Sequence, residues 1–216
     1  MTKNISEQIA AFAAQTAWAD IPADVRHEAK RSLLNYFATA IAGSNEIGMK
    51  KSLSVLAPFA ATGACKIIGR AEQVDMAFAA YLNGVSANIY DFDDTHQETV
   101  IHPTAPIAPA VFAHAEVRPC DGKALLKAFI IGGEIECRIG NAVSPSHYAR
   151  GWHITATCGV FGASAAIAGM LDLSEEQHVW ALGNAAAYTS VLVENLGTMS
   201  KSISVGNAAR NGILSA

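Results

Sequence analysis

Residues 88–109 read NIYDFDDTHQETVIHPTAPIAP and gather four acidic residues and two histidines within an otherwise apolar, alanine-rich chain. If the helix expected before them continues through DFDDT, Asp91, Asp94 and Thr95 share one face by i, i+3 and i+4 spacing, and Asp93 points elsewhere. Carboxylates this close together need a cation, a proton or hydrogen-bond donors when they are buried. The stretch therefore predicts a site for chemistry on a polar ligand.

Three kinds of chemistry could use these residues. DFDDT matches the D-x-D-x-T nucleophile motif of haloacid-dehalogenase-type phosphatases, but GVSANIY before it is a poor candidate for the apolar strand that this motif needs. A metal site could use the aspartates with His96 or His102, but no signature such as an EF-hand loop or H-E-x-x-H is present. The third kind, metal-free acid/base chemistry, is the one that the neighbouring residues favour.

His102 carries that prediction. It precedes Pro103, which disfavours a helical conformation at His102 and places it at the start of the next helix. The positive end of the helix dipole favours a neutral imidazole that can accept a proton, and it also attracts anions. This combination suits the abstraction of a proton beside a substrate carboxylate.

Two later segments repeat the arrangement. In YARGWHITATCGVFGASAA, His153 lies just ahead of a helix of small residues, with Thr155 and Arg150 nearby, and in GTMSKSISVG, Lys201 lies at the start of a third such helix. Three helix N-termini that carry His102, His153 and Lys201 would form a pocket for a polyanionic small molecule, provided that the fold brings them together. Ordinary structural roles are assigned to His27, His114, His147 and His178.

The hydrophobic spacing predicts an all-α fold in a single domain, residues 1–216. Apolar residues recur at helical intervals, and no alternating strand pattern competes with them. Segment 44–70 is expected to be looser, with a short strand at CKIIG. We expect helices at residues 5–13, 22–42, 74–89, from 103, 121–140, 153–170, from 174 and 202–216. The last pattern stops without a cap, as though the chain were cut there.

The composition argues against several classes of protein. Hydrophobic residues make up 51%, charged residues 16% and aromatic residues only 7%, so the helices are expected to pack through alanine, both internally and between subunits. The net charge of −4 and the lack of a basic run argue against nucleic-acid binding. Without a signal peptide or a membrane span in the sequence, we expect a cytoplasmic protein. Its four cysteines are expected to be reduced and buried, namely Cys65, Cys120, Cys137 and Cys158.

Five ordered blocks make the chain similar to the MmgE/PrpD family over nearly its whole length. They are PADVRHEAKRSLLNYFATAIAG, YLNGVSANIYDFDDTH with HPTAPIAPAVFAHAE, IGGEIECRIG, GWHITATCGVFGASAA and GTMSKSISVGNAARNGILSA. The family includes 2-methylcitrate dehydratases, cis-aconitate decarboxylases and iminodisuccinate epimerases, which act on small polycarboxylates without an organic cofactor. The resemblance implies a homodimeric, dehydratase-like lyase, with epimerisation and decarboxylation as the alternatives.

The resemblance also implies roles for individual residues. Asp91, Thr95 and His102 resemble the family's first active-site block, His153 the histidine of its GWH block, and Lys201 its lysine. On this basis His102 or His153 is the acid or base, and Asp91 orients a histidine or binds a substrate hydroxyl. The predicted substrate-binding residues are Thr95 and Lys201, together with Arg150, which is included because it lies near His153 in the sequence. We predict neither a metal ion nor a cofactor.

Three departures from the family pattern bear on these expectations. Ser204 stands where decarboxylase-like members often carry a histidine, which weighs against decarboxylation, and Asn35 stands where an aspartate is common. The chain is also shorter than family members, in which a smaller α/β lid domain interrupts the helical domain. The alternative to an enzyme is therefore a catalytically incomplete helical module that serves dimerisation.

Overall fold

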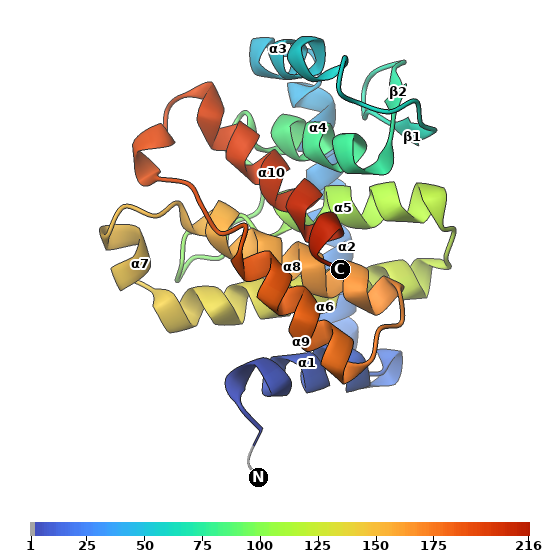
Figure 1. The fold of residues 1–216 in the computed structure, drawn as a ribbon, viewed down its shortest axis with the longest axis vertical. Helices are drawn as coiled ribbons and strands as arrows, with labels where there is room; N and C mark the ends of the chain where they lie inside the picture. Colours follow the sequence, from blue (N-terminus) through green and yellow to red (C-terminus); the bar gives the residue numbers. More distant parts are fainter. Residues whose placement is uncertain (1–2) are drawn as a thin grey trace.

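The computed structural model describes residues 3–216, which form helices packed around a buried helical centre (Figure 1). The elements are α1 (Ile5–Gln15), η1 (Trp18–Asp20), α2 (Ala23–Gly43), α3 (Ile47–Leu56), β1 (Cys65–Lys66), β2 (Gln73–Val74), α4 (Met76–Asn88), α5 (Thr104–Val117), α6 (Gly122–Val143), α7 (Ser146–Ala149), α8 (Ile154–Met170), α9 (Glu175–Ala186), η2 (Val193–Asn195) and α10 (Met199–Ser215). Among these residues only β1 and β2 form a sheet, an antiparallel pair that joins Cys65 to Val74. The all-α prediction is confirmed.

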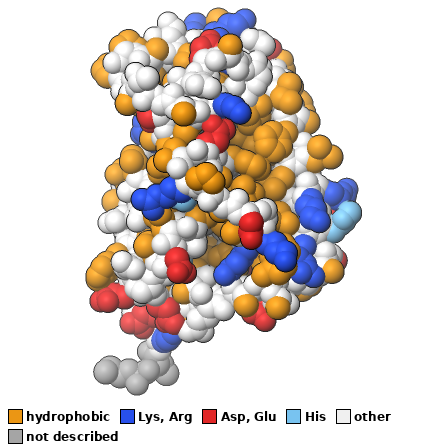
Figure 2. Space-filling model, turned by 90° about the vertical axis from the view of Figure 1, so that its right-hand side faces the viewer, with side chains coloured by type: hydrophobic (Ala, Val, Ile, Leu, Met, Phe, Trp, Pro, Cys, Tyr) orange, Lys and Arg blue, Asp and Glu red, His pale blue; other side chains and the backbone are white. Residues whose placement is uncertain are grey.

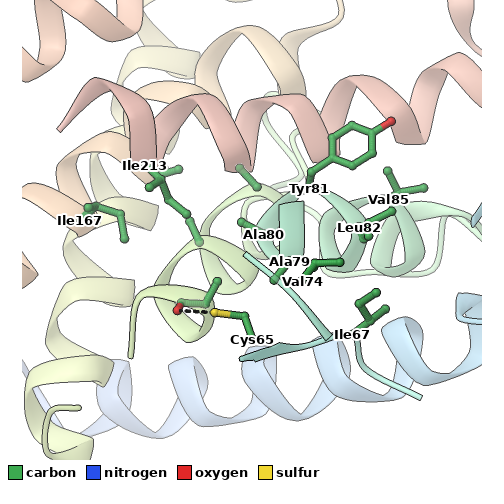
Figure 3. Close-up of a cluster of buried hydrophobic side chains, with 14 of the residues drawn as sticks. Cys65, Ile67, Val74, Ala79, Ala80, Tyr81, Leu82, Val85, Ile167 and Ile213 are labelled. Carbon is green, nitrogen blue, oxygen red and sulfur yellow. Dashed lines mark hydrogen bonds between the residues drawn. The ribbon is translucent and has the colours of Figure 1, made fainter. Parts of the chain in front are cut away.

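Helices α4, α5 and α8 form the centre of the molecule and are buried on nearly all sides. Every residue of α4 from Ala79 to Asn88 is buried, as is every residue of α8 from Ile154 to Val160. Figure 3 shows one apolar cluster at this centre, to which α4, the β1–β2 hairpin, α8 and α10 contribute Tyr81, Leu82, Val85, Cys65, Ile67, Val74, Ile167 and Ile213. Helices that are apolar on all sides are typical of such a position.

Glycines let α10 lie very close to α4 and α8. A Cβ at Gly206 would collide with the backbone oxygen of Tyr81 in α4 and would lie 2.7 Å from a methyl group of Val85. A Cβ at Gly212 would collide with Ala163 of α8. Small residues at these crossings therefore set the separation of the helices, as the alanine-rich composition predicted.

Three helix starts agree with the sequence. Asp121 accepts a hydrogen bond from the backbone of Ala124 at the start of α6, and Ser174 forms the predicted capping box with Gln177 at the start of α9. Pro103 immediately precedes α5. Two other predicted boundaries are less accurate. Helix α6 continues past Gly140 to Val143, and α10 begins at Met199, three residues before its predicted start.

Three expectations are wrong. Helix α4 ends at Asn88, so Asp91, Asp94 and Thr95 do not share a helical face. Segment 44–70 contains helix α3 as well as the expected strand. The cysteines are not all buried, because Cys120 lies exposed in the connection between α5 and α6.

The surface keeps a number of apolar side chains. Figure 2 shows orange patches over much of one face, with several lysine and arginine side chains in its lower half. Among the exposed large side chains are Leu34 and Ile41 of α2. None of the helices in residues 3–216 combines the length and the hydropathy that a membrane span requires.

Candidate active site

Asp91 lies on the connection that leaves α4, and its backbone is in the left-handed region with φ of 60°. Few residues other than glycine adopt this conformation, although aspartate tolerates it better than most, and such residues concentrate at functional sites. The turn directs the Asp91 carboxylate toward the N-termini of α5 and α10. An aspartate that follows the end of α4 thereby reaches side chains of two other helices.

A chain of close polar contacts links Lys201, Asp91, His102 and Asp93. The Lys201 ammonium pairs with Asp91 Oδ1, and the same oxygen lies 3.1 Å from His102 Nε2. On the other side of the ring, His102 Nδ1 lies 3.5 Å from Asp93 Oδ1 and 3.4 Å from Thr95 Oγ1. The imidazole of His102 is therefore held between two carboxylates, and one of them, Asp91, also pairs with Lys201.

The two carboxylates next to His102 differ in environment. The side chain of Asp91 is 58% exposed and that of Asp93 only 2%. Burial raises the pKa of Asp93, and this effect is opposed by the charge of His102 and by a 2.9 Å hydrogen bond from the Asn88 amide. Asp91 is thus the carboxylate that solvent and ligands can reach, whereas Asp93 supports the ring from within.

The side chains of Asp93 and Asp94 point in the directions opposite to those that helical spacing predicted. Asp93 faces His102, while Asp94 accepts hydrogen bonds from the backbone and the hydroxyl of Thr104 in the first turn of α5. Burial raises the pKa of Asp94 as well. Asp94 therefore fixes the connection between α4 and α5, and no hydrogen bond or ion pair of the described residues joins its side chain to a histidine.

Two hydrogen bonds of backbone N–H groups fix the position of His102. His96 and Ile101 form an isolated antiparallel bridge, in which the His96 N–H donates to the Ile101 oxygen at 2.8 Å. The backbone N–H of His102 then donates to Thr155 Oγ1, 3.2 Å away in the first turn of α8. The starts of α5 and α8 are thereby joined directly.

His153 is the N-cap residue of α8 and is only 4% exposed. Its backbone N–H donates to the carbonyl of Val191 at 3.0 Å, and its Nδ1 lies 3.3 Å from Ser204 Oγ. Because Ser204 donates its hydroxyl hydrogen to the Lys201 carbonyl at 2.6 Å, its oxygen accepts from His153. His153 therefore carries its hydrogen on Nδ1 and keeps the lone pair of Nε2 for another partner.

The charge state of His153 follows from its surroundings. Burial lowers its pKa to about 4, and Lys201 and His102 act in the same direction. The ring is therefore neutral near pH 7 and can accept a proton, close to the ammonium group of Lys201. A neutral base beside a fixed positive charge suits a reaction on an anionic substrate.

The profile of the MmgE/PrpD N-terminal domain matches residues 7–216, which include all of these side chains. The chain belongs to the MmgE/PrpD family. It is 32% identical to a cis-aconitate decarboxylase of Aspergillus terreus over 97% of this chain and 44% of that protein. It is 29% identical to the cis-aconitate decarboxylase-like protein oryM of Aspergillus oryzae over 99% of this chain and 46% of that protein. It is 34% identical to the cis-aconitate decarboxylase of Homo sapiens over 63% of this chain and 29% of that protein. The chain thus spans less than half the length of these curated relatives.

The structure brings together five of the six residues predicted to form the site. They are Asp91, Thr95, His102, His153 and Lys201. Arg150 lies exposed on the turn after α7, and no hydrogen bond or ion pair within residues 3–216 joins its side chain to the other five. Its assignment to substrate binding rests on sequence alone.

Sequence reasoning missed two contributors to this MmgE/PrpD site. Asp93 was expected to point away, because its position was read from a helix that in fact ends earlier. Ser204 was noted only as a departure from the family pattern, although it lies three residues after Lys201 and so on the same face of α10. That spacing is the signal that could have linked it to the site.

The same cluster offers ligand atoms for a cation. Asp91, Asp93 and His102 each present one atom, and the three atoms lie within 4.8 Å of one another. Carboxylate and imidazole groups suit a divalent metal. The Lys201 ammonium, however, lies on the same oxygen of Asp91 and already compensates its charge. The donor set is better matched to lysine and a proton than to a metal ion.

Proposed function

We propose that this chain supplies acid/base residues of a cytoplasmic, cofactor-independent lyase or isomerase that acts on a small di- or tricarboxylate. The observation that carries the proposal is a neutral, buried His153 within the electrostatic influence of the Lys201 ammonium, the two residues lying at the N-termini of two adjacent helices. A carboxylate substrate is attracted to the Lys201 ammonium and to the helix N-termini, and a proton on the neighbouring carbon then meets an imidazole that can accept it.

Each residue has a role in this proposal. Lys201 and the positive dipole ends at the starts of α5, α8 and α10 hold substrate carboxylates. The Nε2 lone pair of His153 takes a proton from the carbon next to a carboxylate. His102, between Asp91 and Asp93, delivers a proton to the leaving group or to the opposite face, and Thr95 lies beside its ring to bind a substrate oxygen.

The reactions under consideration differ in which bond breaks. In dehydration, the carbon–hydrogen electron pair forms a double bond while hydroxide leaves as water with the proton from His102. In epimerisation, a proton returns to the other face of the same carbon. In decarboxylation, carbon dioxide leaves, its bonding pair stays with the carbon skeleton, and a carbon gains one proton.

Decarboxylation of cis-aconitate is the first reaction to test, because the relatives described above carry that name. Dehydration of a hydroxy acid such as 2-methylcitrate is the second. It is favoured by Ser204, which gives His153 a hydroxyl partner where decarboxylase-like family members often have a histidine.

Proton NMR in D₂O tests the proposal. The folded chain is mixed separately with cis-aconitate and with 2-methylcitrate, and His153→Gln is the matched control. We expect consumption of one acid, or deuterium beside one of its carboxylates, that is lost in the control. A chain that is helical by circular dichroism but leaves both acids unchanged and undeuterated would contradict the proposal and favour the dimerisation module instead.

A homodimer is part of the same proposal. Its support in this chain is the set of exposed apolar side chains, among them Leu34 and Ile41 on α2. Sedimentation velocity over a range of concentrations is expected to show a dimer. A monomer at every concentration would contradict both the homodimer and the scaffold alternative.

A further inference from the structure

A separate cavity of about 230 Å³ lies at the other ends of the helices that start in the candidate active site. His114 and Arg118 border it from the end of α5, Gly169 and Met170 from the end of α8, and Lys127 from α6. The candidate site is at the N-termini of α5 and α8, so the length of these helices separates the two places. A liquid water molecule occupies about 30 Å³, so the cavity has room for a small organic molecule.

His114 is the least satisfied group in the lining of this cavity. Its side chain is 4% exposed, and neither ring nitrogen has a hydrogen-bond partner in residues 3–216. Buried polar groups are nearly always paired, and leaving one unpaired is costly. Burial and the nearby Arg118 lower the pKa of His114, so the ring is neutral and has one N–H donor and one acceptor nitrogen that no group of residues 3–216 pairs with.

The charged side chains of the lining are all positive. Arg118 and Lys127 contribute them, no acidic residue lines the cavity, and neither side chain belongs to an ion pair of residues 3–216. Arg118 directly follows the last turn of α5, where the helix dipole favours positive charge without any ligand. Lys127 lies in the N-terminal half of α6, where the dipole gives no such reason. Lys127 and the unpaired His114 together suit an anionic ligand.

We propose that this cavity binds a small anion that carries carboxylate or phosphate groups. Arg118 and Lys127 pair with its oxygens, and the His114 ring donates to one oxygen and accepts from a hydroxyl or a protonated oxygen of the same molecule. The site is distinct from the candidate active site, which the anionic substrate of the proposed reaction would occupy.

NMR of ¹⁵N-labelled histidine rings tests the proposal, with succinate as the carboxylate probe and inorganic phosphate as the phosphate probe. The Lys201→Gln variant is titrated beside the wild type so that binding at the candidate active site is removed. We expect at least one probe to shift the His114 ring signals in both proteins. Which probe does so identifies the chemistry of the ligand. Unmoved His114 signals with both probes would overturn the proposal and leave water as the occupant.

Two variants and a control separate a built site from general attraction to positive charge. The double variant Arg118→Gln and Lys127→Gln is expected to weaken the binding that His114 reports by about tenfold or more, because charge-assisted hydrogen bonds are lost. Ala124→Leu, at an exposed position of the lining, is expected to weaken it by filling space without altering charge. Lys123→Gln removes a single positive charge from the exposed first turn of α6 outside the lining. Equal weakening by Lys123→Gln, or none by the other two variants, would overturn the proposal.

Discussion

The crossing of α4 with α10 and the polar ends of the same two helices are held in place by different forces. At the crossing, Gly206 and Gly84 let two backbones approach so closely that a Cβ at Gly84 would lie 3.0 Å from the Cα of Gly206. At the ends, Asp91 and Lys201 meet through opposite charges, with the Asp91 side chain 58% exposed. The ion pair in solvent is worth little by itself. Close packing in the core therefore sets the distance between α4 and α10. The charged side chains at the ends of the two helices form their contacts at the separation that this packing fixes.

The largest effect is expected from a substitution at the candidate active site that leaves the packed core unchanged. His153→Gln removes the proposed base while keeping a polar side chain of similar size at the start of α8. Turnover, or deuterium exchange in the acid that the chain accepts, is expected to fall by about 100-fold or more. The thermal midpoint, followed by circular dichroism, is expected to change little. Unchanged turnover would remove His153 from the proposed mechanism.

A change in the core is expected to damage both regions. Gly206→Val places side-chain atoms where the Tyr81 backbone and Val85 now lie, so the free energy of unfolding is expected to drop by about 3 kcal/mol. Urea denaturation measures this loss.

The matched control for Gly206 is Gly183→Ala in α9. Within residues 3–216, nothing outside the helix itself lies within 4 Å of a Cβ at that position, so the substitution is expected to stabilise the helix by about 0.5–1 kcal/mol. Equal effects of the two substitutions would show that close packing does not distinguish Gly206.

Glu136 is a titratable group inside the core, so the stability of the core is expected to depend on pH. It is fully buried in α6, neither carboxyl oxygen has a hydrogen-bond partner in the described chain, and burial raises its pKa well above the usual value, with Asp94 adding to the rise. The folded state therefore binds this proton more tightly than the unfolded state does. Its contribution to stability is present below about pH 4.5 and is lost as pH rises through the folded pKa.

Glu136→Gln removes that loss. Relative to the wild type, the free energy of unfolding of the variant is expected to rise by about 1.4 kcal/mol for each pH unit between pH 4.5 and the folded pKa of Glu136. Chemical denaturation at a series of pH values from 4 to 9 measures the difference. A difference that stays constant over this range would mean that Glu136 does not hold its proton in the folded state.

The smallest effect is expected at Arg150. Since its side chain is exposed and no hydrogen bond or ion pair of residues 3–216 joins it to the other five residues, Arg150→Gln is expected to alter KM and turnover by no more than about twofold and stability by less than about 0.5 kcal/mol. Steady-state kinetics with the accepted acid provides the check. A tenfold rise in KM at constant turnover would restore Arg150 as a substrate-binding residue.

The parts of this molecule that local sequence determines were predictable. Asp121 and Ser174 cap their helices because an oxygen at that position satisfies free backbone N–H groups, and Pro103 sets the start of α5 by its fixed backbone angle. Family blocks then placed Asp91, Thr95, His102, His153 and Lys201 in one site, and the structure brings these five side chains together.

What could not be predicted depends on contacts between distant segments. The end of α4 and the left-handed turn at Asp91 have no proline or glycine to mark them, so Asp93 and Asp94 were assigned to the wrong sides. The link from His153 to Ser204 joins residues 51 apart in the sequence, and only the packing of α8 on α10 creates it.

The ionisation of His153 is the most direct test of the central claim, which is that the packed core holds a neutral base beside Lys201. Two-dimensional ¹⁵N NMR of the histidine rings measures its pKa and shows which nitrogen carries the hydrogen. The account predicts a pKa of about 4 and hydrogen on Nδ1 at pH 7. A His153 that titrates near 6.5, or that carries its hydrogen on Nε2, would contradict it.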